Sequence, residues 1–323
     1  MADDSLFEIS IGDRTYSMES DDEYLRDMRG VFEPQTVELF RALVAPDAIA
    51  LDVGANVGCT ALLLSQLAAE TVAFEPSPST FRRLERNVAT ASNVSVVNAG
   101  LGREDAELSI VFAPSNRSGG FISADRPEGH VVESVRIKQG DDHVATSLSG
   151  RRVDFIKIDV EGFELEVLAG LSQTIKRDQP IVTLELNHWC LNAFQRTSVP
   201  DFLDELLDTF PILFAVQGGE AVALHEPANR FRVMYSHILH FEYSTLVGAF
   251  SEEQLAVFVD AYVTHGSPAQ SPPSPYERID QLEKLLRKRD RRLKKMSDQV
   301  DAMKASTSWR VTRPLRAVKA RMK

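Results

Sequence analysis

Apolar and polar residues alternate at the start of the chain, and the spacing then becomes helical. Residues 6–18, LFEISIGDRTYSM, alternate on both sides of Gly12 and Asp13, which predicts a β-hairpin with its turn at these two residues. Residues 31–44, VFEPQTVELFRALV, carry apolar residues three and four positions apart with Pro34 near the first turn. This second pattern predicts a helix.

Short β-rich runs alternate with helical patterns through the next two hundred or so residues. Helical patterns follow the first two runs, at residues 60–68 and 78–91. The alternation predicts an α/β fold with a mostly parallel sheet and helices on both faces. The runs that we predict as strands are residues 48–53, 71–75, 94–99, 153–159, 180–186, 212–216 and 235–241.

A change of composition separates this body, residues 1–265, from the rest of the chain. Residues 266–275, GSPAQSPPSP, have the Pro, Ser and Gly content of a semi-rigid linker. Residues 276–306 then carry apolar positions that step by three and four, which predicts a coiled coil and a homo-oligomer formed through residues 279–303. An isolated charged helix is the alternative. The stepping positions are Ile279, Leu282, Leu286, Arg289, Leu293, Met296, Val300 and Met303, and only Arg289 is polar.

Charge is distributed unevenly along the 323 residues. Residues 276–323 hold 16 Lys and Arg against 6 Asp and Glu, whereas residues 1–275 hold 20 against 41. Residues 307–323 form a basic amphipathic segment that suits a membrane surface or a partner protein. We expect no nucleic-acid partner, because the acidic body opposes docking on a phosphate backbone and Trp309 is the tail's single aromatic side chain.

Neither the N-terminus nor the hydropathy pattern suggests export or membrane insertion. MADDSLFEIS lacks the basic and then apolar order of a signal peptide, and no apolar run is long enough to span a bilayer. Cys59 and Cys190 lie far apart in sequence and fit a reducing compartment. We therefore expect a cytoplasmic protein, peripheral at the inner face of the membrane if its tail binds lipid.

Residues 51–60, LDVGANVGCT, connect a predicted strand to a predicted helix through a glycine turn. A dinucleotide-binding turn needs G-x-G-x-x-G, but Asn56 and Cys59 occupy the second and third glycine positions. A P-loop is excluded because no Gly-Lys-Ser/Thr follows. Asp52 before the turn suits a cationic ammonium, which indicates an amino-acid nucleoside held by the turn, Gly54, Ala55, Asn56 and Gly58. Simple packing of helix on strand is the alternative.

The ends of the next two predicted strands supply further cofactor positions. Glu75, followed by Pro76, lies about 20 residues after the turn, where a carboxylate accepts both ribose hydroxyls of a cofactor without a 2′-phosphate. Asn98 and Ala99, before Gly100, could pass beside an adenine ring.

These motifs resemble the FkbM family of S-adenosylmethionine-dependent methyltransferases. The resemblance rests on LDVGANVG, FEP and above all DFIKIDVEGFELEVLAG at residues 154–170, and it covers roughly the first 245 residues. It implies a seven-stranded class I, Rossmann-like methyltransferase fold, S-adenosylmethionine as the methyl donor, and O-methylation, often of sugars. Residues 139–144, QGDDHV, depart from the Leu-Asp pair that is more frequent in the family.

Acidic residues at the end of the fourth predicted strand are candidates for the acceptor chemistry. Methyl transfer to a hydroxyl needs a group that removes a proton. Asp159 and Glu161 lie where ligands bind in open α/β sheets, and Lys157 alternates onto the same side. We predict Asp159 nearest to the methyl group, in contact with both cofactor and acceptor, with Glu161 assisting. In the alternative, Glu161 caps the following helix.

The fifth predicted strand ends in Glu185, Asn187 and His188. His188 is a third catalytic candidate because its ordinary pKa lies near working pH. A packed histidine is the alternative. Asp159, Glu161, Glu185 and His188 are also possible Mg²⁺ ligands, but nothing in their spacing demands a metal and we predict none.

Glu33 and residues 115–123, SNRSGGFIS, are candidates for a wall or flexible lid over the acceptor. The short SWRVTRPLR stretch resembles C-terminal segments that follow coiled coils in bacterial polysaccharide-assembly proteins. The sequence therefore indicates an O-methyltransferase of a saccharide or glycoconjugate in bacterial surface-polysaccharide biosynthesis. A small-molecule or lipid acceptor, and a non-catalytic scaffold that acts through its coiled coil, are the alternatives.

Overall fold

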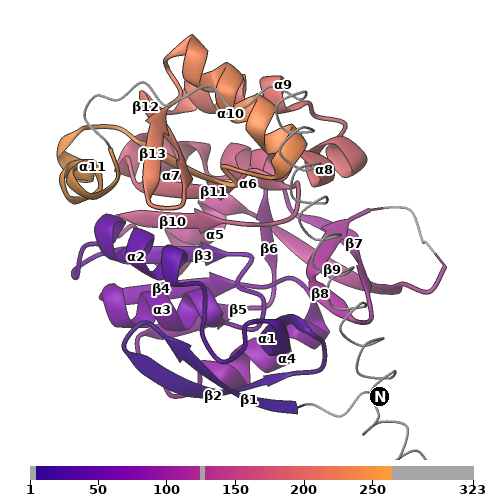
Figure 1. Ribbon diagram of the computed structural model, residues 1–323. Coiled ribbons are helices and arrows are strands. Elements are labelled where there is room, and N and C mark those ends of the chain that lie inside the picture. The colour runs from indigo at the N-terminus through magenta and orange to yellow at the C-terminus, as the bar shows by residue number, and fades with distance from the viewer. Residues whose placement is uncertain (1–4, 124–127, 264–323) are drawn as a thin grey trace, which may run out of the picture. The chain divides into compact units, whose positions relative to one another are not determined.

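The computed structural model describes residues 5–123 and 128–263. The predicted linker, coiled coil and basic tail lie outside the described residues. The described part contains two β-sheets and a hairpin (Figure 1).

Eight strands form the central mixed sheet, in the order β13-β12-β14-β11-β10-β3-β4-β5. The five strands from β11 to β5 pair in parallel, whereas β14 is antiparallel to both of its neighbours and β13 is antiparallel to β12. The strands are β3 Ile49–Val53, β4 Glu70–Phe74, β5 Val94–Val97, β10 Phe155–Ile158, β11 Ile181–Glu185, β12 Ile212–Gln217, β13 Glu220–Ala223 and β14 Thr245–Ala249. The prediction of seven strands needs correction, because one predicted strand is absent while β13 and β14, which were not predicted, bring the number to eight. Both β13 and β14 pair antiparallel, so antiparallel pairs occupy one side of the sheet.

Helices cover both faces of this sheet because alternate side chains of each strand point in opposite directions. Ala50 and Phe155 enter one buried cluster, where the ring of Phe40 on α2 packs edge-on to that of Phe155 at 5.2 Å. Leu51 and Ile156 enter the other cluster, on the opposite face. The helices are α1 Tyr24–Asp27, α2 Pro34–Leu43, α3 Cys59–Leu67, α4 Pro78–Asn87, α5 Gly140–Ser147, α6 Glu164–Gly170, α7 Ser172–Asp178, α8 His188–Cys190, η1 Leu191–Gln195, α9 Val199–Thr209, α10 Pro227–His240, η2 Glu253–Leu255 and α11 Ala256–Tyr262.

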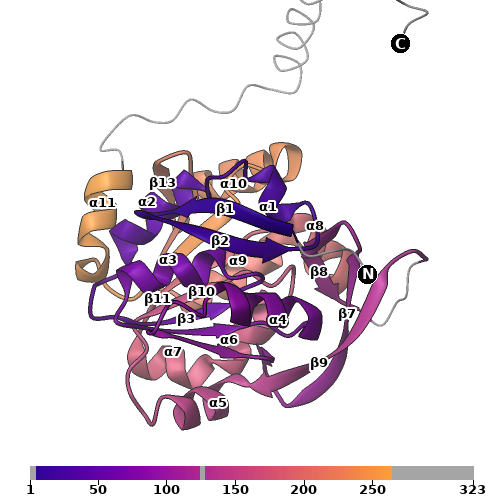
Figure 2. The same ribbon diagram turned by 90° about the horizontal axis from the view of Figure 1, so that it is seen from below.

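The N-terminal hairpin forms as the alternation predicts. Strands β1, Ser5–Ile11, and β2, Arg14–Ser20, pair antiparallel around Gly12 and Asp13. The hairpin lies against α3 and α4 and is seen in front of them from below (Figure 2). It thus covers helices that follow the glycine turn.

A second sheet of four strands, which the sequence patterns did not indicate, lies at one side of the molecule (Figures 1 and 2). Its order is β6-β9-β7-β8, with bounds β6 Gly100–Gly102, β7 Ala106–Ala113, β8 Asn116–Ile122 and β9 Val131–Gln139. The expectation of a loop at residues 115–123 is wrong, since most of this segment is strand β8. Backbone pairing with β7, rather than side-chain alternation, makes this Ser- and Gly-rich segment a strand.

The predicted strand at residues 235–241 is also wrong, because residues 227–240 form helix α10. Pro227 occupies the first turn, and the buried residues Val233, Ser236 and His237 are three and four positions apart. The strand pattern came from a short apolar run in which Ile238 and Leu239 are in fact exposed. No helix within residues 5–123 and 128–263 is long and apolar enough to cross a membrane.

The close contact between helix α6 and strand β6 leads to the first prediction. A Cβ atom on Gly170, at the end of α6, would overlap the backbone oxygen of Gly102 on β6. We expect Gly170→Ala to lower the free energy of unfolding by at least about 2 kcal/mol, because backbone atoms must move apart. Urea denaturation measures this loss. The control is Gly119→Ala, whose Cβ would meet only the side chain of Asn116, and equal effects of the two changes would contradict the prediction.

Candidate active site

The glycine turn brings the backbone of residues 54–56 against the end of β10. Gly54 has φ +83° and a Cβ atom there would overlap the backbone oxygen of Asp159. The N–H groups of Gly54 and Ala55 both donate to the Phe74 carbonyl, at 3.1 and 2.9 Å. Gly58 has φ +102° and leads into α3. Only glycine fits the first position, so the strand ends β3, β4 and β10 meet at one point.

Two cavities meet at this turn. One, the Glu75 cavity, is lined by Glu75, Pro76, Gly100, Leu101 and Phe163 among others and has a volume of about 70 Å³. The other, the Lys157 cavity, has about 330 Å³ and is lined by Lys157, Thr183 and Glu185 among others. Both are lined by Gly54, Asn56, Ser118, Asp159 and Glu161. A single elongated ligand could therefore pass from one cavity to the other over the glycine turn.

Glu75 is held rigidly in its cavity. One carboxylate oxygen accepts from the N–H of Asn56 at 3.0 Å and the other from the N–H of Ser77 at 2.9 Å. Burial raises the pKa of Glu75 to about 7, although both N–H groups oppose this shift. Asn98 donates from Nδ2 to the carbonyls of Glu75 and Pro76, at 2.9 and 3.2 Å. Asn98 and the buried Ala99 therefore support this loop and do not line either cavity.

A row of polar side chains crosses three neighbouring strands below the Lys157 cavity. Asp52, Lys157 and Thr183 are direct partners in the parallel registers of β3, β10 and β11. Lys157 is buried and donates to the Gly54 carbonyl at 2.7 Å, while its Nζ lies 3.3 Å from Asp52 and 3.6 Å from Asp159. Burial alone would lower the pKa of Lys157, but Asp52 and Asp159 outweigh burial and raise it.

Asp52, predicted to contact the ammonium of an amino-acid nucleoside, lines neither cavity. Its side chain is fully buried, and it accepts from the Thr60 hydroxyl at 2.6 Å. Asp52 therefore contacts the site through Lys157 and Thr60.

The structure brings Asp159 and Glu161 together, as predicted from their positions. Glu161 adopts φ +52° and its Oε2 accepts from Asn187 at 3.0 Å and from the Cys190 thiol at 3.1 Å. Burial, followed by the charge of Asp159, raises the pKa of Glu161 to about 7. Helix capping by Glu161, the alternative, does not occur. Glu164 instead accepts from the N–H groups of Val160 and Gly162, at 3.2 and 3.1 Å.

His188 lies apart from these carboxylates. It lines neither cavity, and its ring packs against those of His237 and Phe241 with centroids 5.0 Å apart in each case. The structure therefore favours a packing role for His188 over a catalytic role. Strand β11 presents Thr183 and Glu185 to the cavity instead. Thr183 was missed, although it stands two positions before Glu185 and therefore on the same face of the strand.

N-terminal residues and the second sheet close the Lys157 cavity. Glu33, predicted as part of its wall, lines it together with Tyr24, and Ser118 lines it from β8. Asp21 binds the guanidinium of Arg117 on β8 through two contacts of 2.7 Å and that of Arg83 on α4 at 2.9 Å. These ion pairs connect the N-terminal segment to β8 and α4. Within the described ranges, no group of three or more His, Cys, Asp or Glu side chains is arranged to hold a metal.

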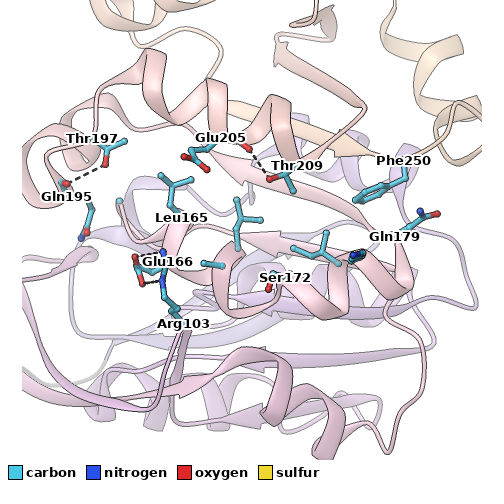
Figure 3. Close-up of a pocket in the computed structure, with 15 residues that line it drawn as sticks. Arg103, Leu165, Glu166, Ser172, Gln179, Gln195, Thr197, Glu205, Thr209 and Phe250 are labelled. Carbon is cyan, nitrogen blue, oxygen red and sulfur yellow. Dashed lines mark hydrogen bonds and ion pairs between the residues drawn. The ribbon is translucent and has the colours of Figure 1, made fainter.

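A further cavity of about 670 Å³, the Arg103 cavity, lies beside α6, α7 and α9 (Figure 3). Arg103 and Glu166 pair within it at 3.2 Å, and Gln179 and Phe250 line its other side. It contains none of the residues predicted to bind cofactor or acceptor.

Comparison with known proteins identifies the domain that carries the turn. Residues 52–212, from Asp52 to the start of β12, match the family model described as methyltransferase FkbM domain. The chain contains an FkbM methyltransferase domain. This domain includes the glycine turn, Glu75, Lys157 and the carboxylates at the ends of β10 and β11.

Curated relatives match the chain over part of its length. The chain is 32% identical over 152 residues to the hexuronic acid methyltransferase AglP of Haloferax volcanii, with 47% of this chain and 61% of the relative covered. It is 33% identical over 153 residues to methyltransferase 1 of Beauveria bassiana, with 40% of this chain and 61% of the relative covered. The 2-O-methyltransferase NoeI of Sinorhizobium fredii is 26% identical over 164 residues, with 45% of this chain and 66% of the relative covered. The chain thus spans about three fifths of the length of the first two relatives.

Among solved structures, a methyltransferase FkbM from Methylobacillus flagellatus is 17% identical, with 53% of this chain and 42% of that chain covered and a TM-score of 0.37. A TM-score this low does not establish a shared fold. The family assignment therefore rests on the sequence match.

The buried ammonium of Lys157 generates a prediction about stability. We expect Lys157→Met to lower the free energy of unfolding by about 3–5 kcal/mol, because Asp52 and the Gly54 carbonyl lose their cation inside the protein. Urea denaturation tests it. The control is Arg41→Met, which removes an exposed cation paired with Asp13 and Glu38 and should cost less than about 1 kcal/mol. A loss for Lys157→Met as small as that of the control would contradict the prediction.

Proposed function

We propose that the protein is an S-adenosylmethionine-dependent O-methyltransferase that acts on a hydroxyl of a saccharide or glycoconjugate. The observation that carries this proposal is the pair of cavities that meet at the glycine turn and at Asp159. In such an arrangement the ribose meets Glu75 at the Glu75 cavity and the reacting groups meet in the Lys157 cavity.

The residues around the turn fit the cofactor. Glu75 presents a carboxylate to the ribose hydroxyls, and Pro76 and Gly100 line the same cavity. Gly54, Ala55 and Asn56 approach the ligand with their backbone, and Gly58 starts α3 close behind them. When bound, the cofactor supplies an electrophilic methyl group on a cationic sulfonium. Asp159, exposed between the two cavities, stabilises that positive charge and orients the acceptor.

The charges of the Lys157 cavity favour an acceptor without a carboxylate. Its lining contains four carboxylates, those of Glu33, Asp159, Glu161 and Glu185, and a single cation. That cation, Lys157, is already engaged by Asp52 and Asp159. A uronic acid would add a carboxylate to this group, and the cavity lining offers no further cation to pair with it, which is costly in a partly buried site. We therefore propose a neutral sugar or an amino sugar, which differs from the hexuronic acid named for AglP.

Saccharide as the acceptor class is supported by the name of the hexuronic acid methyltransferase AglP, and methylation on oxygen by the name of the 2-O-methyltransferase NoeI. A role in bacterial surface-polysaccharide biosynthesis, an oligomer formed through residues 279–303 and docking of residues 307–323 on a membrane or partner are further parts of the proposal, supported by the sequence patterns. The polar lining of the Lys157 cavity favours a saccharide over a lipid intermediate.

Calorimetric titration with S-adenosylmethionine and S-adenosylhomocysteine tests the cofactor. We expect micromolar binding that Glu75→Ala abolishes, because the ribose loses its acceptor, and that Glu85→Ala on the exposed face of α4 leaves unchanged. A folded wild-type protein that binds neither ligand would contradict the proposal and favour the scaffold.

Transfer of a labelled methyl group tests the acceptor. Neutral sugars, amino sugars and uronic acids of matched ring configuration are compared as acceptors of the wild-type protein. We expect methylation of a neutral or amino sugar and a kcat/KM at least about ten-fold lower for the matching uronic acid, because its carboxylate meets like charges. A preference for the uronic acid would contradict the charge argument and leave the cofactor assignment intact.

A further inference from the structure

Two buried oxygen atoms in the Lys157 cavity have no hydrogen-bond partner among the described residues. They are Oγ1 of Thr183 and Oε2 of Glu185. Thr183 is only 3% exposed, and both residues line the cavity from the same face of β11. Leaving a buried polar atom unpaired costs about 1–3 kcal/mol. Two such atoms from residues that line one cavity therefore mark the position of polar groups of a ligand.

The other carboxylates near this position already have partners. Asp159 is paired with Lys157 at 3.6 Å. Glu161 accepts two hydrogen bonds at its Oε2. Glu164 accepts two from the backbone N–H groups of Val160 and Gly162. Glu185 is the carboxylate in this group whose buried oxygen is left for a ligand.

We propose that Glu185 accepts the proton of the acceptor hydroxyl during methyl transfer, and that Thr183 binds the same acceptor beside it. This assignment rests on the proposed function. As the hydroxyl oxygen forms its bond to the methyl carbon, the carbon–sulfur bond breaks and its electron pair stays on sulfur, which becomes a neutral thioether. The hydroxyl proton moves to the Glu185 carboxylate and later passes to water.

The surroundings of Glu185 couple this proton to cofactor binding. Burial raises the pKa of Glu185 well above its usual value, and the charges of Asp159, Glu161 and Glu164 add to the effect while Lys157 opposes it. On its other side β14 places Thr245, an uncharged residue, opposite Glu185. A sulfonium cation in the same cavity favours the carboxylate form. Binding of the methyl donor therefore expels a proton and prepares the base, whereas the neutral thioether product expels fewer protons.

Proton release on binding tests this coupling without an acceptor. S-adenosylmethionine and S-adenosylhomocysteine are titrated into the wild-type protein, Glu185→Gln and the control Glu166→Gln, at pH 7 in two buffers of different ionisation enthalpy. Glu166 is paired with Arg103 outside both cavities. We expect the wild type and the control to release more protons with the sulfonium than with the thioether, and Glu185→Gln to lose most of that difference. Equal proton release by Glu185→Gln and the wild type would overturn the assignment.

Methyl transfer to the best sugar found for the wild type gives the second readout. We expect Glu185→Gln to lower kcat by about 10²- to 10⁴-fold with little change in cofactor affinity, and to remove the rise of rate with pH. Glu185→Asp should restore part of the rate, because it restores a carboxylate. If the kcat of Glu185→Gln lies within about three-fold of the wild-type kcat, the Glu185 assignment is overturned and the proposed function is kept. A wild type that binds no methyl donor overturns the proposed function and this assignment with it.

Discussion

The ammonium of Lys157 is the interaction on which the candidate site depends. It lies buried between β3 and β10, where Asp52, Asp159 and the Gly54 carbonyl surround it. A cation in this position compensates part of the negative charge of the carboxylates at the ends of β3, β10 and β11, which are Asp52, Asp159, Glu161 and Glu185. It also holds the glycine turn in place, since the Gly54 carbonyl accepts a hydrogen bond from it. The cavity above it can then stay acidic without forcing the strand ends apart.

That acidity suits a cationic methyl donor. Glu75, Glu161 and Glu185 all have pKa values raised first of all by burial, so each gains from a nearby positive charge. The donor carries a positive sulfonium and the product does not. The same cavity would therefore favour the substrate form of the cofactor over the product form, and the cost of assembling the carboxylates would be offset when the donor binds.

The second sheet contributes the remaining wall. Arg117 on β8 is held by Asp21 and contacts Ser79 at 2.6 Å, which places Ser118 at the junction of the two cavities. Gly170 and Gly102 allow α6 and β6 to approach closely enough for this sheet to stand beside the strand ends. The Ser- and Gly-rich segment of β8, which looks like a loop in the sequence, thus becomes part of the site through backbone pairing with β7.

The sequence by itself determined the features that depend on local order. The glycine turn, Glu75 at the end of β4, the carboxylates after β10 and the helix at Pro34 follow from spacing and from the period of two or 3.6 residues. Local order could not predict residues 227–240 correctly, because a short apolar run suits a strand as well as a helix. Only the tertiary structure decided that Asp52 and Asn98 stand behind the cavities, that His188 packs against His237 and that Thr183 faces the acceptor side. Those outcomes depend on which strands become neighbours and which side chains are buried between them, and that pairing joins residues too distant in the chain for any local pattern to specify.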